Sequence, residues 1–322
     1  MSAVLVVRPS SLGDVVYALA IVSDIKEHLP GCAVDWVAER AFVPLVRLDA
    51  RVRHVIAFGL RSWRERPLST QTWADMRAFR RDVVRERYTA VLNLQEQVKG
   101  ALVSRLARGT RHGFDRASVR EVASTWFDHV HHHAPRPMHF VQRCRVLAAG
   151  ALGYRVSGPP RWQLRAPREL PIDIGRPHIV ALHMSSRADK WWPDERWREA
   201  LAHFAHAGYA VVLPWGTAAE GERSRAIANG IEHAVVPSQL PLPQVAALLQ
   251  SAELVVGVDT GLTHLAAALR TPTLAVFTST DAAQAGVAVT GNGIDLGGNG
   301  MVPSVADVIA AGGRLLSTQP RC

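Results

Sequence analysis

The sequence predicts an α/β protein made of two Rossmann-like domains that face each other across a cleft. Short apolar runs typical of buried strands alternate with segments of helical periodicity, which is the pattern of parallel βαβ units. The 322 residues are also too many for one ordinary core, and roughly 150 residues per domain suggests two domains. Because a stretch rich in proline and arginine, residues 158–177, interrupts the alternation, we place the boundary there and expect domains over 1–165 and 166–322.

The first half begins with a strand, a tight loop and a helix. The strand is predicted over residues 4–7, the loop is Pro9-Ser10-Ser11-Leu12-Gly13, and the helix runs from Asp14 to about residue 27. Further strands are predicted at 33–37, 52–56 and 90–94, and a helix with a dense arginine face at 73–87.

The alternation restarts in the second half. Strands are predicted at 178–183, 210–213, 254–258 and 273–277, and helices at 193–207, 220–228, 243–249 and 263–269. A last helix near 305–316 is a candidate for packing back on the first domain. Since ligands of open parallel sheets bind at the carboxyl ends of strands, we expect functional residues directly after them.

The two halves of the chain differ in net charge. Residues 1–165 hold 26 Lys and Arg against 14 Asp and Glu, a net charge of +12, whereas residues 166–322 hold 11 against 14, a net charge of −3. A basic half joined to a mildly acidic one indicates an anionic partner for the first half. Lys26, Lys99 and Lys190 are the only lysines, so a lysine inside a motif is informative.

Composition excludes several classes of protein. With 48% apolar and 20% charged residues, the chain is neither disordered nor fibrous. No window approaches the ~20 apolar residues of a membrane span. The spacing of the three cysteines matches neither a metal site nor a disulfide framework, as is typical of proteins in a reducing compartment; they are Cys32, Cys144 and Cys322. We therefore expect a cytoplasmic protein.

The loop after the first strand is a candidate anion site. Gly13 permits close backbone approach, and the start of the following helix attracts negative charge. The loop lacks the G-x-G-x-x-G pattern of dinucleotide sites, which disfavours NAD chemistry. Asp14 is interpreted either as the helix N-cap or as a carboxylate that takes a proton from a hydroxyl, and the two roles are compatible. The helix terminus would lower its pKa and make it a weak base that stays ionised.

A second motif follows the strand at 254–258. Asp259-Thr260-Gly261 leads directly into a helix whose first turn carries His264. The amides of Thr260 and Gly261 would point at a ligand phosphate. The structural alternative is a capped helix with a histidine satisfied in the core.

D-T-G-x-x-H-x-A-A in the second half, with S-S-x-G-D near the start, resembles the ADP-heptose glycosyltransferases of lipopolysaccharide core synthesis, most closely their heptosyltransferase I branch. The resemblance spans nearly the whole chain. It implies a GT-B fold, inverting transfer of heptose from ADP-heptose, and a Kdo acceptor on lipid A. The further segments that carry it are Leu60-Arg61-Ser62-Trp63-Arg64, His183-Met184-Ser185-Ser186-Arg187-Ala188-Asp189-Lys190 and Leu213-Pro214-Trp215-Gly216.

Four further residues of the second half fit a nucleotide-sugar donor. The hydroxyls of Ser185 and Ser186 follow a strand and suit phosphate oxygens, although they also suit a turn. Lys190 suits a departing diphosphate, which gains negative charge as the glycosidic bond breaks; the alternative is a solvated surface lysine. Trp215 would form one side of the adenine pocket, or alternatively belong to the hydrophobic core. The complete donor set that the resemblance implies adds Glu220, as a ribose ligand or a helix-start acid, and Asp259, Thr260, Gly261 and His264.

Arginines of the first half fit an anionic acceptor, because their forks recognise carboxylate and phosphate in two-point fashion. The alternative for any single arginine is a place on a solvated face, where charge runs are more often found. The family pattern favours Ser10, Ser11, Gly13, Arg61, Arg64, Lys99 and Arg120 as acceptor-binding residues. The helical arginines Arg77, Arg80, Arg81, Arg85 and Arg87 are interpreted as surface, suited to anionic lipid.

Two segments fit no site. His129, His131, His132 and His133 lack the spacing of a zinc site, and nearby prolines indicate a surface loop, so we predict no metal. Residues 278–282 and 286–300 depart from the family pattern, so Thr280 carries little weight as part of the donor-pocket wall.

The resemblance therefore implies an inverting glycosyltransferase that moves L-glycero-D-manno-heptose from ADP-heptose to Kdo of a Kdo₂-lipid A acceptor, with any membrane contact peripheral, at the cytoplasmic face of the inner membrane. Asp14 is the expected base and Lys190 the second catalytic residue, with no cofactor, metal or nucleic acid. The alternatives are heptosyltransferase II or III acting on a heptosylated core, a non-catalytic anion or nucleic-acid binder, and an NAD-dependent oxidoreductase.

Overall fold

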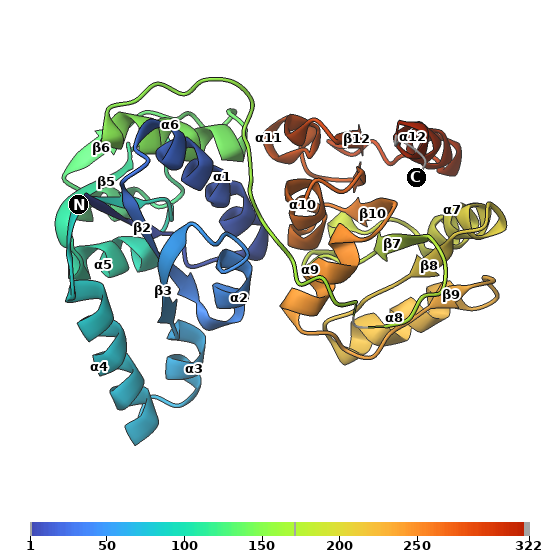
Figure 1. Ribbon diagram of the computed structural model, residues 1–322, viewed down its shortest axis with the longest axis horizontal. Coiled ribbons are helices and arrows are strands. Elements are labelled where there is room, and N and C mark those ends of the chain that lie inside the picture. The colour runs from blue at the N-terminus through green and yellow to red at the C-terminus, as the bar shows by residue number, and fades with distance from the viewer. Residues whose placement is uncertain (1, 171, 319–322) are drawn as a thin grey trace. The chain divides into compact units, whose positions relative to one another are not determined.

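The computed structural model describes residues 2–170 and 172–318, and it divides the chain into two compact units, Met1–Gln163 and Leu164–Cys322 (Figure 1). The division falls two residues before the boundary expected from the sequence. Each unit holds one six-stranded parallel sheet with helices, so the predicted α/β class with two Rossmann-like halves is confirmed. Within the described ranges, no helix combines the length and the apolar character needed to cross a bilayer. Cys322 lies outside these ranges.

The sheet of the first unit has the strand order β3-β2-β1-β4-β5-β6. Its strands are β1 (Ala3–Val7), β2 (Ala33–Glu39), β3 (Val52–Phe58), β4 (Arg87–Asn93), β5 (Arg108–Phe114) and β6 (Val130–His132). Its helices are α1 (Leu12–His28), η1 (Arg40–Phe42), α2 (Val43–Val46), α3 (Leu60–Glu65), α4 (Thr70–Val84), α5 (Val98–Leu106), η2 (Val122–Phe127) and α6 (Phe140–Leu152). The chain order reverses between β1 and β4, and such a switch point is where open α/β sheets bind ligands.

The sheet of the second unit has the order β12-β11-β10-β7-β8-β9. Its strands are β7 (His178–Leu182), β8 (Ala210–Val212), β9 (Ala234–Val235), β10 (Leu254–Val258), β11 (Thr273–Phe277) and β12 (Gly293–Gly297). Its helices are η3 (Ala188–Lys190), α7 (Asp194–His206), α8 (Ala218–Ala228), α9 (Leu242–Gln250), α10 (Gly261–Ala268), α11 (Ala282–Ala285), η4 (Ala288–Thr290) and α12 (Val305–Ser317). Here the switch point lies between β7 and β10.

The last helix, α12, packs on its own unit. Val308, Ala311 and Leu315 join the core of the second unit together with Phe204 of α7. A β-carbon at Gly312 would lie 2.7 Å from the Phe204 ring, so α12 approaches α7 closely. The core-facing side of this helix is thus used within the second unit.

The predicted helix at 73–87 was misplaced at both ends. The helix, α4, covers Thr70–Val84, and Arg87 already begins the next strand, β4. The prediction ran too far because Arg85 and Arg87 continue the arginine pattern of the helix, although Arg87 already belongs to the strand.

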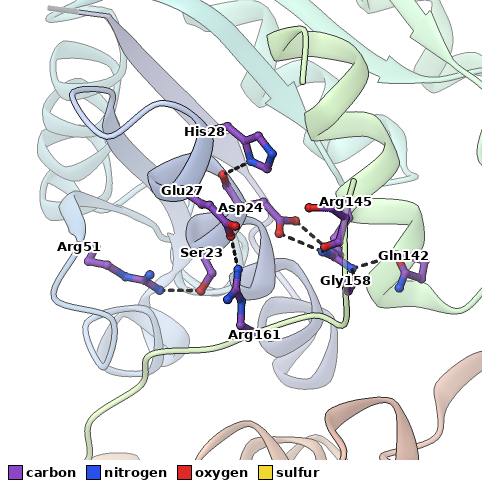
Figure 2. Close-up of polar contacts among 10 residues, drawn as sticks. Ser23, Asp24, Glu27, His28, Arg51, Gln142, Arg145, Gly158 and Arg161 are labelled. Atoms are coloured by element: carbon purple, nitrogen blue, oxygen red, sulfur yellow. Dashed lines mark hydrogen bonds and ion pairs between the residues drawn. The ribbon is translucent and has the colours of Figure 1, made fainter. Parts of the chain in front are cut away.

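A buried ion pair joins α1 to α6 in the first unit (Figure 2). The guanidinium of Arg145 donates to both carboxylate oxygens of Asp24, at 2.8 and 3.0 Å, and the side chains are only 1% and 6% exposed. Arg145 also donates to the carbonyls of Ser157 and Gly158, at 3.0 Å each. One side chain therefore fixes two helices and the segment that follows the second.

Arg145→Met is expected to lower the free energy of unfolding of the first unit by about 3–5 kcal/mol, because it leaves the Asp24 carboxylate buried without its cation. Arg161→Met is the matched control, since the Arg161–Glu27 pair is 60% and 46% exposed and is worth about 1 kcal/mol or less. Denaturant unfolding of the full chain, followed by tryptophan fluorescence, compares the two variants. Equal losses would contradict the structural role of the buried pair.

Candidate active site

Asp14 lies in the first turn of α1, which begins at Leu12 with Ser11 as its N-cap. The interpretation of Asp14 as the N-cap is therefore wrong: it is the third helical residue. Its Oδ2 accepts hydrogen bonds from the Ser11 amide, at 2.9 Å, and from the Ser11 hydroxyl, at 2.8 Å. The other oxygen, Oδ1, lies 2.7 Å from Nη2 of Arg8. The carboxylate is held from both sides and is still 29% exposed.

Arg8 sets the electrostatics of this carboxylate. Its side chain is buried directly after β1 and also donates to the carbonyl of Leu94, which follows β4. Burial raises the pKa of Asp14, but the charge of Arg8 and the two Ser11 hydrogen bonds outweigh it, so the pKa lies below its usual value. Asp14 is consequently a fixed, ionised and weakly basic carboxylate at neutral pH.

Lys99 joins Asp14 at the switch point of the first unit. It lies in the first turn of α5, and its Nζ donates to the hydroxyl of Ser10 at 2.8 Å. The structure therefore brings Ser10, Ser11, Asp14 and Lys99 together where the carboxyl ends of β1 and β4 meet. Gly13 lies in the same helical turn and is partly exposed.

The predicted acceptor arginines are less closely gathered. Arg61 on α3 is 88% exposed and pairs with Glu65. Arg64, on the same helix, lines a cavity that Lys99 also lines. Arg120 is exposed in the segment between β5 and η2. Of the three arginines, Arg64 is the one that shares a surface with the Lys99 end of the site.

The switch point of the second unit holds a triad of charged and polar side chains around Asp259. Its Oδ2 lies 2.6 Å from Nζ of Lys190, and its Oδ1 lies 3.2 Å from Nε2 of His264. The hydroxyl of Ser185 donates to the carbonyl of Asp259 at 3.0 Å. These residues come from the segments after β7 and after β10, which are adjacent strands.

Asp259 is buried and Lys190 nearly so, with side chains 7% and 19% exposed. Burial raises the pKa of Asp259, but the hydrogen bond and charge of His264 and those of Lys190 outweigh it and hold this pKa below its usual range. Lys190 is thus a positioned cation, and the alternative of a solvated surface lysine is wrong.

The start of α10 lies directly after Asp259, beside these charged side chains. Thr260 precedes the helix, and its carbonyl accepts from the amides of Thr263 and His264, at 3.1 and 3.3 Å. Thr260 and Gly261 are partly exposed, whereas Ser186 is exposed. A β-carbon at Gly257 would lie 2.2 Å from Oγ1 of Thr263, so glycine is required there for α10 to approach β10 this closely.

Trp215 and Glu220 lie after β8. Trp215 donates from Nε1 to the carbonyl of Pro237 at 2.7 Å, and a β-carbon at Gly221 would lie 2.9 Å from its ring. Glu220 accepts with Oε2 from the amides of Gly216, at 2.7 Å, and Thr217, at 3.3 Å. The structure thus places Glu220 as a helix-start acid and leaves Trp215 partly buried beside it.

Sequence reasoning missed three residues that support these sites. Arg8 orients Asp14, as described above. Thr278 donates to the carbonyl of Asp189 at 2.6 Å and so holds the turn that carries Lys190. Arg223 lies over the ring of Trp191, 4.5 Å from its centroid. Arg8 had a recognisable signal, a charge directly after an apolar strand, whereas the other two depend on contacts distant in sequence.

Thr280, which carries little weight as part of the predicted donor-pocket wall, is partly buried. Its carbonyl accepts a hydrogen bond from the Asn299 amide at 3.4 Å.

The histidine-rich segment is partly a strand. Residues Val130–His132 form β6 at the edge of the first sheet, so the loop expected from the prolines is wrong there. Each histidine has a protein partner: Arg111 for His129, the Thr125 carbonyl for His131, His112 for His132 and Asp115 for His133. Across the part of the chain that the structure describes, no group of three or more His, Cys, Asp or Glu side chains is arranged to hold a metal ion.

Comparison with known proteins identifies the family. A model described as glycosyltransferase family 9 (heptosyltransferase) matches residues 76–295. Lipopolysaccharide heptosyltransferase 1 of Escherichia coli (strain K12) is 39% identical over 282 residues, which cover 86% of this chain and 88% of that protein. The protein of the same name from Pseudomonas aeruginosa is 36% identical over 285 residues, with 86% and 79% covered.

Solved structures agree. E. coli heptosyltransferase WaaC with ADP has a TM-score of 0.89 at 34% identity, covering 97% of this chain and 99% of that chain. E. coli ADP-heptose lps heptosyltransferase II, at 20% identity, shares the fold with a TM-score of 0.79 and coverage of 98% and 99%. The predicted resemblance and GT-B fold class are confirmed. The chain belongs to glycosyltransferase family 9, the heptosyltransferases, and is an enzyme that transfers a glycosyl group.

Proposed function

We propose that this enzyme moves L-glycero-D-manno-heptose from ADP-heptose to a Kdo hydroxyl of the lipopolysaccharide inner core, with inversion at the anomeric carbon. The observation that carries the proposal is the similarity to proteins named lipopolysaccharide heptosyltransferase 1, at 36–39% identity over 86% of the chain. A protein named lipopolysaccharide heptosyltransferase 3 from E. coli is 22% identical.

The donor binds the second unit in this proposal. WaaC structures hold ADP and ADP-2-deoxy-2-fluoro heptose, which supports a nucleotide-sugar donor here. Ser185, Ser186, Lys190 and the amides of Thr260 and Gly261 hold the diphosphate, with Asp259 and His264 positioning Lys190 and the helix start. Trp215 walls the adenine. Glu220, whose Oε2 is engaged by backbone amides, would reach a ribose hydroxyl with its second oxygen.

The acceptor binds the first unit, where Ser10, Ser11, Gly13, Arg61, Arg64, Lys99 and Arg120 recognise its hydroxyls and anionic groups. Asp14 takes the proton from the attacking Kdo hydroxyl as that oxygen bonds to the anomeric carbon of the heptose. The bond from this carbon to the diphosphate oxygen breaks in the same step, and ADP leaves. A single displacement of this kind inverts the anomeric configuration.

Lys190 stabilises the charge that develops on the departing diphosphate. Its Nζ is held at 2.6 Å from Oδ2 of Asp259, so little reorganisation of the cation is required at the moment of bond cleavage. The proposed mechanism assigns this role to Lys190 and the helix-end amides and uses no metal. We place the enzyme in the cytoplasm, where its basic first half suits an anionic membrane surface.

ADP release tests the proposal. With ADP-heptose and Kdo₂-lipid A we expect multiple turnovers, and the rate should persist in excess EDTA because no step uses a metal. A heptosylated core is the matched second acceptor. Turnover of the heptosylated acceptor without turnover of Kdo₂-lipid A would assign the enzyme to the heptosyltransferase II or III reaction, and ADP release from neither would overturn the proposal.

A further inference from the structure

An apolar groove crosses the surface of the first unit, beside the proposed acceptor site. We call it the α4–α5 groove and define it by the residues of β3, α3, α4 and α5 that line a cavity of about 570 Å³. Figure 1 shows α3 and α4 at one end of the unit, and α5 lies next to α4. A cavity of this volume falls within the ~300–1,000 Å³ range of small-molecule sites.

The helices α4 and α5 each present one side to the groove. On α4 these are Trp73, Met76, Arg77 and Arg80, and on α5 Lys99, Leu102, Val103 and Leu106. Spacings of three, four and seven residues place each set on one side of its helix. Trp73, Met76, Leu102 and Leu106 are all exposed to solvent. Clustered exposed apolar side chains of this kind mark a binding surface.

The floor of the groove is recessed and aromatic. Phe58, Trp63 and Phe79 pack against one another with ring centroids 5.2–5.6 Å apart, and all three are buried. A flat bilayer surface covers exposed side chains but does not fill a recess below them. A single alkyl chain can cover the exposed side chains and also fill the recess. The shape of the groove therefore favours an acyl chain over a membrane face as its occupant.

Four cations surround the apolar floor: Arg64, Arg77, Arg80 and Lys99. Among the described residues, none of the four forms an ion pair with a carboxylate, so their charge is available to an external anion. An apolar groove with a cationic rim is complementary to an anionic lipid, whose phosphates meet the rim while its chain enters the groove.

The groove is continuous with the proposed acceptor site. Lys99 lines the groove and donates to Ser10, two residues after Arg8 and next to Ser11, which binds Asp14. Arg64 likewise belongs both to the groove and to the residues proposed to bind the acceptor. The sugar and the acyl chain of one molecule can therefore occupy the two regions together.

We infer that the α4–α5 groove holds an acyl chain of the lipid acceptor, so that the enzyme recognises the lipid portion as well as the sugar. This inference rests on the proposed function, because it takes the acceptor to be an anionic acylated saccharide. Binding one chain in the groove adds about fourfold in affinity for each methylene that is fully buried. Even partial burial of a chain therefore predicts a large difference between acylated and deacylated acceptors.

The test compares Kdo₂-lipid A with its fully deacylated form, both presented in the same nonionic detergent at fixed concentration. Affinity is measured by calorimetric titration and KM by ADP release. For the wild type we expect at least tenfold tighter binding and tenfold lower KM for the acylated acceptor. Met76→Glu and Leu102→Glu place a carboxylate in the groove and should abolish this preference, with kcat and KM for the deacylated acceptor unchanged.

Leu68→Glu is the matched control. Leu68 is 90% exposed between α3 and α4 but does not line the groove, so this variant should retain the preference for the acylated acceptor. Loss of the preference in Leu68→Glu to the same extent would assign the effect to a membrane or micelle face and overturn the inference. Equal wild-type affinity for the two acceptors would also overturn it. Because affinity is measured without turnover, this result stays separate from a failure of the proposed reaction, which would appear as no ADP release.

Discussion

Asp14→Asn is expected to lower kcat by about 10²-fold or more while leaving the affinity for ADP unchanged. Asparagine keeps the shape of the side chain and one oxygen that can accept from Ser11, but it cannot take the proton of the acceptor hydroxyl. The nucleotide is proposed to bind the second unit, so its affinity should not depend on this change. Stopped assays for ADP release and calorimetric titration with ADP measure the two quantities.

The same substitution has a structural cost that must be separated from the chemical one. Arg8 is buried beside Asp14, and loss of its anionic partner is expected to lower the free energy of unfolding by about 3–5 kcal/mol. Rates are therefore compared at temperatures well below the unfolding transition of the variant. A variant that is folded, binds ADP and keeps the wild-type rate would show that Asp14 only positions Arg8 and the start of α1.

The pH dependence distinguishes this base from an ordinary one. The pKa of Asp14 is lowered from 3.8. The carboxylate is thus already ionised across the neutral and mildly acidic range, and kcat should show no acid-side decrease from this group until the pH falls below about 4. Its contribution to stability has the sign of a depressed carboxyl pKa: present above the unfolded-state value and lost as the pH falls through the lower folded-state value.

The strands that carry the two sites could be predicted because they are buried on both faces. All five residues of β1, β7, β10 and β11 are buried, and such strands appear in the sequence as continuous apolar runs. The strands at or next to the β6 and β9 edges of the sheets gave no such pattern. β5 has the sequence RGTRHGF and depends on its neighbours β4 and β6, while β9 has two residues. Tertiary pairing, not local preference, determines these strands.

The residues of the candidate site also fall into those that a local sequence pattern predicts and those that depend on tertiary pairing. Motif residues directly after a strand could be found, because chain connectivity alone places them at the carboxyl edge of a sheet. The role of Glu220 also had a local signal, since Thr217-x-x-Glu220 is a capping-box pattern. The ion pair of Lys190 with Asp259 spans 69 residues of sequence and depends on β7 lying beside β10, so no local pattern could predict it.

That ion pair leads to the second large effect. Lys190→Met is expected to lower kcat by about 10²–10³-fold, because the variant keeps most of the unbranched side chain but loses the charge that stabilises the leaving diphosphate. It also leaves the buried Asp259 carboxylate with His264 alone, which should lower the free energy of unfolding of the second unit. A loss of rate in this single variant is therefore compatible with either a catalytic or a structural role.

The double variant Lys190→Met with Asp259→Asn separates these roles. It removes the cation and the carboxylate together, so no unpaired charge remains buried, and the free energy of unfolding should recover relative to Lys190→Met. The charge on the leaving group is still not stabilised, so kcat should stay low. Denaturant unfolding measures the free energy of unfolding, and ADP release measures kcat, for the wild type, Lys190→Met and the double variant. If kcat recovered together with stability, the ion pair would be structural, and the helix-end amides of Thr260 and Gly261 would have to stabilise the diphosphate without Lys190.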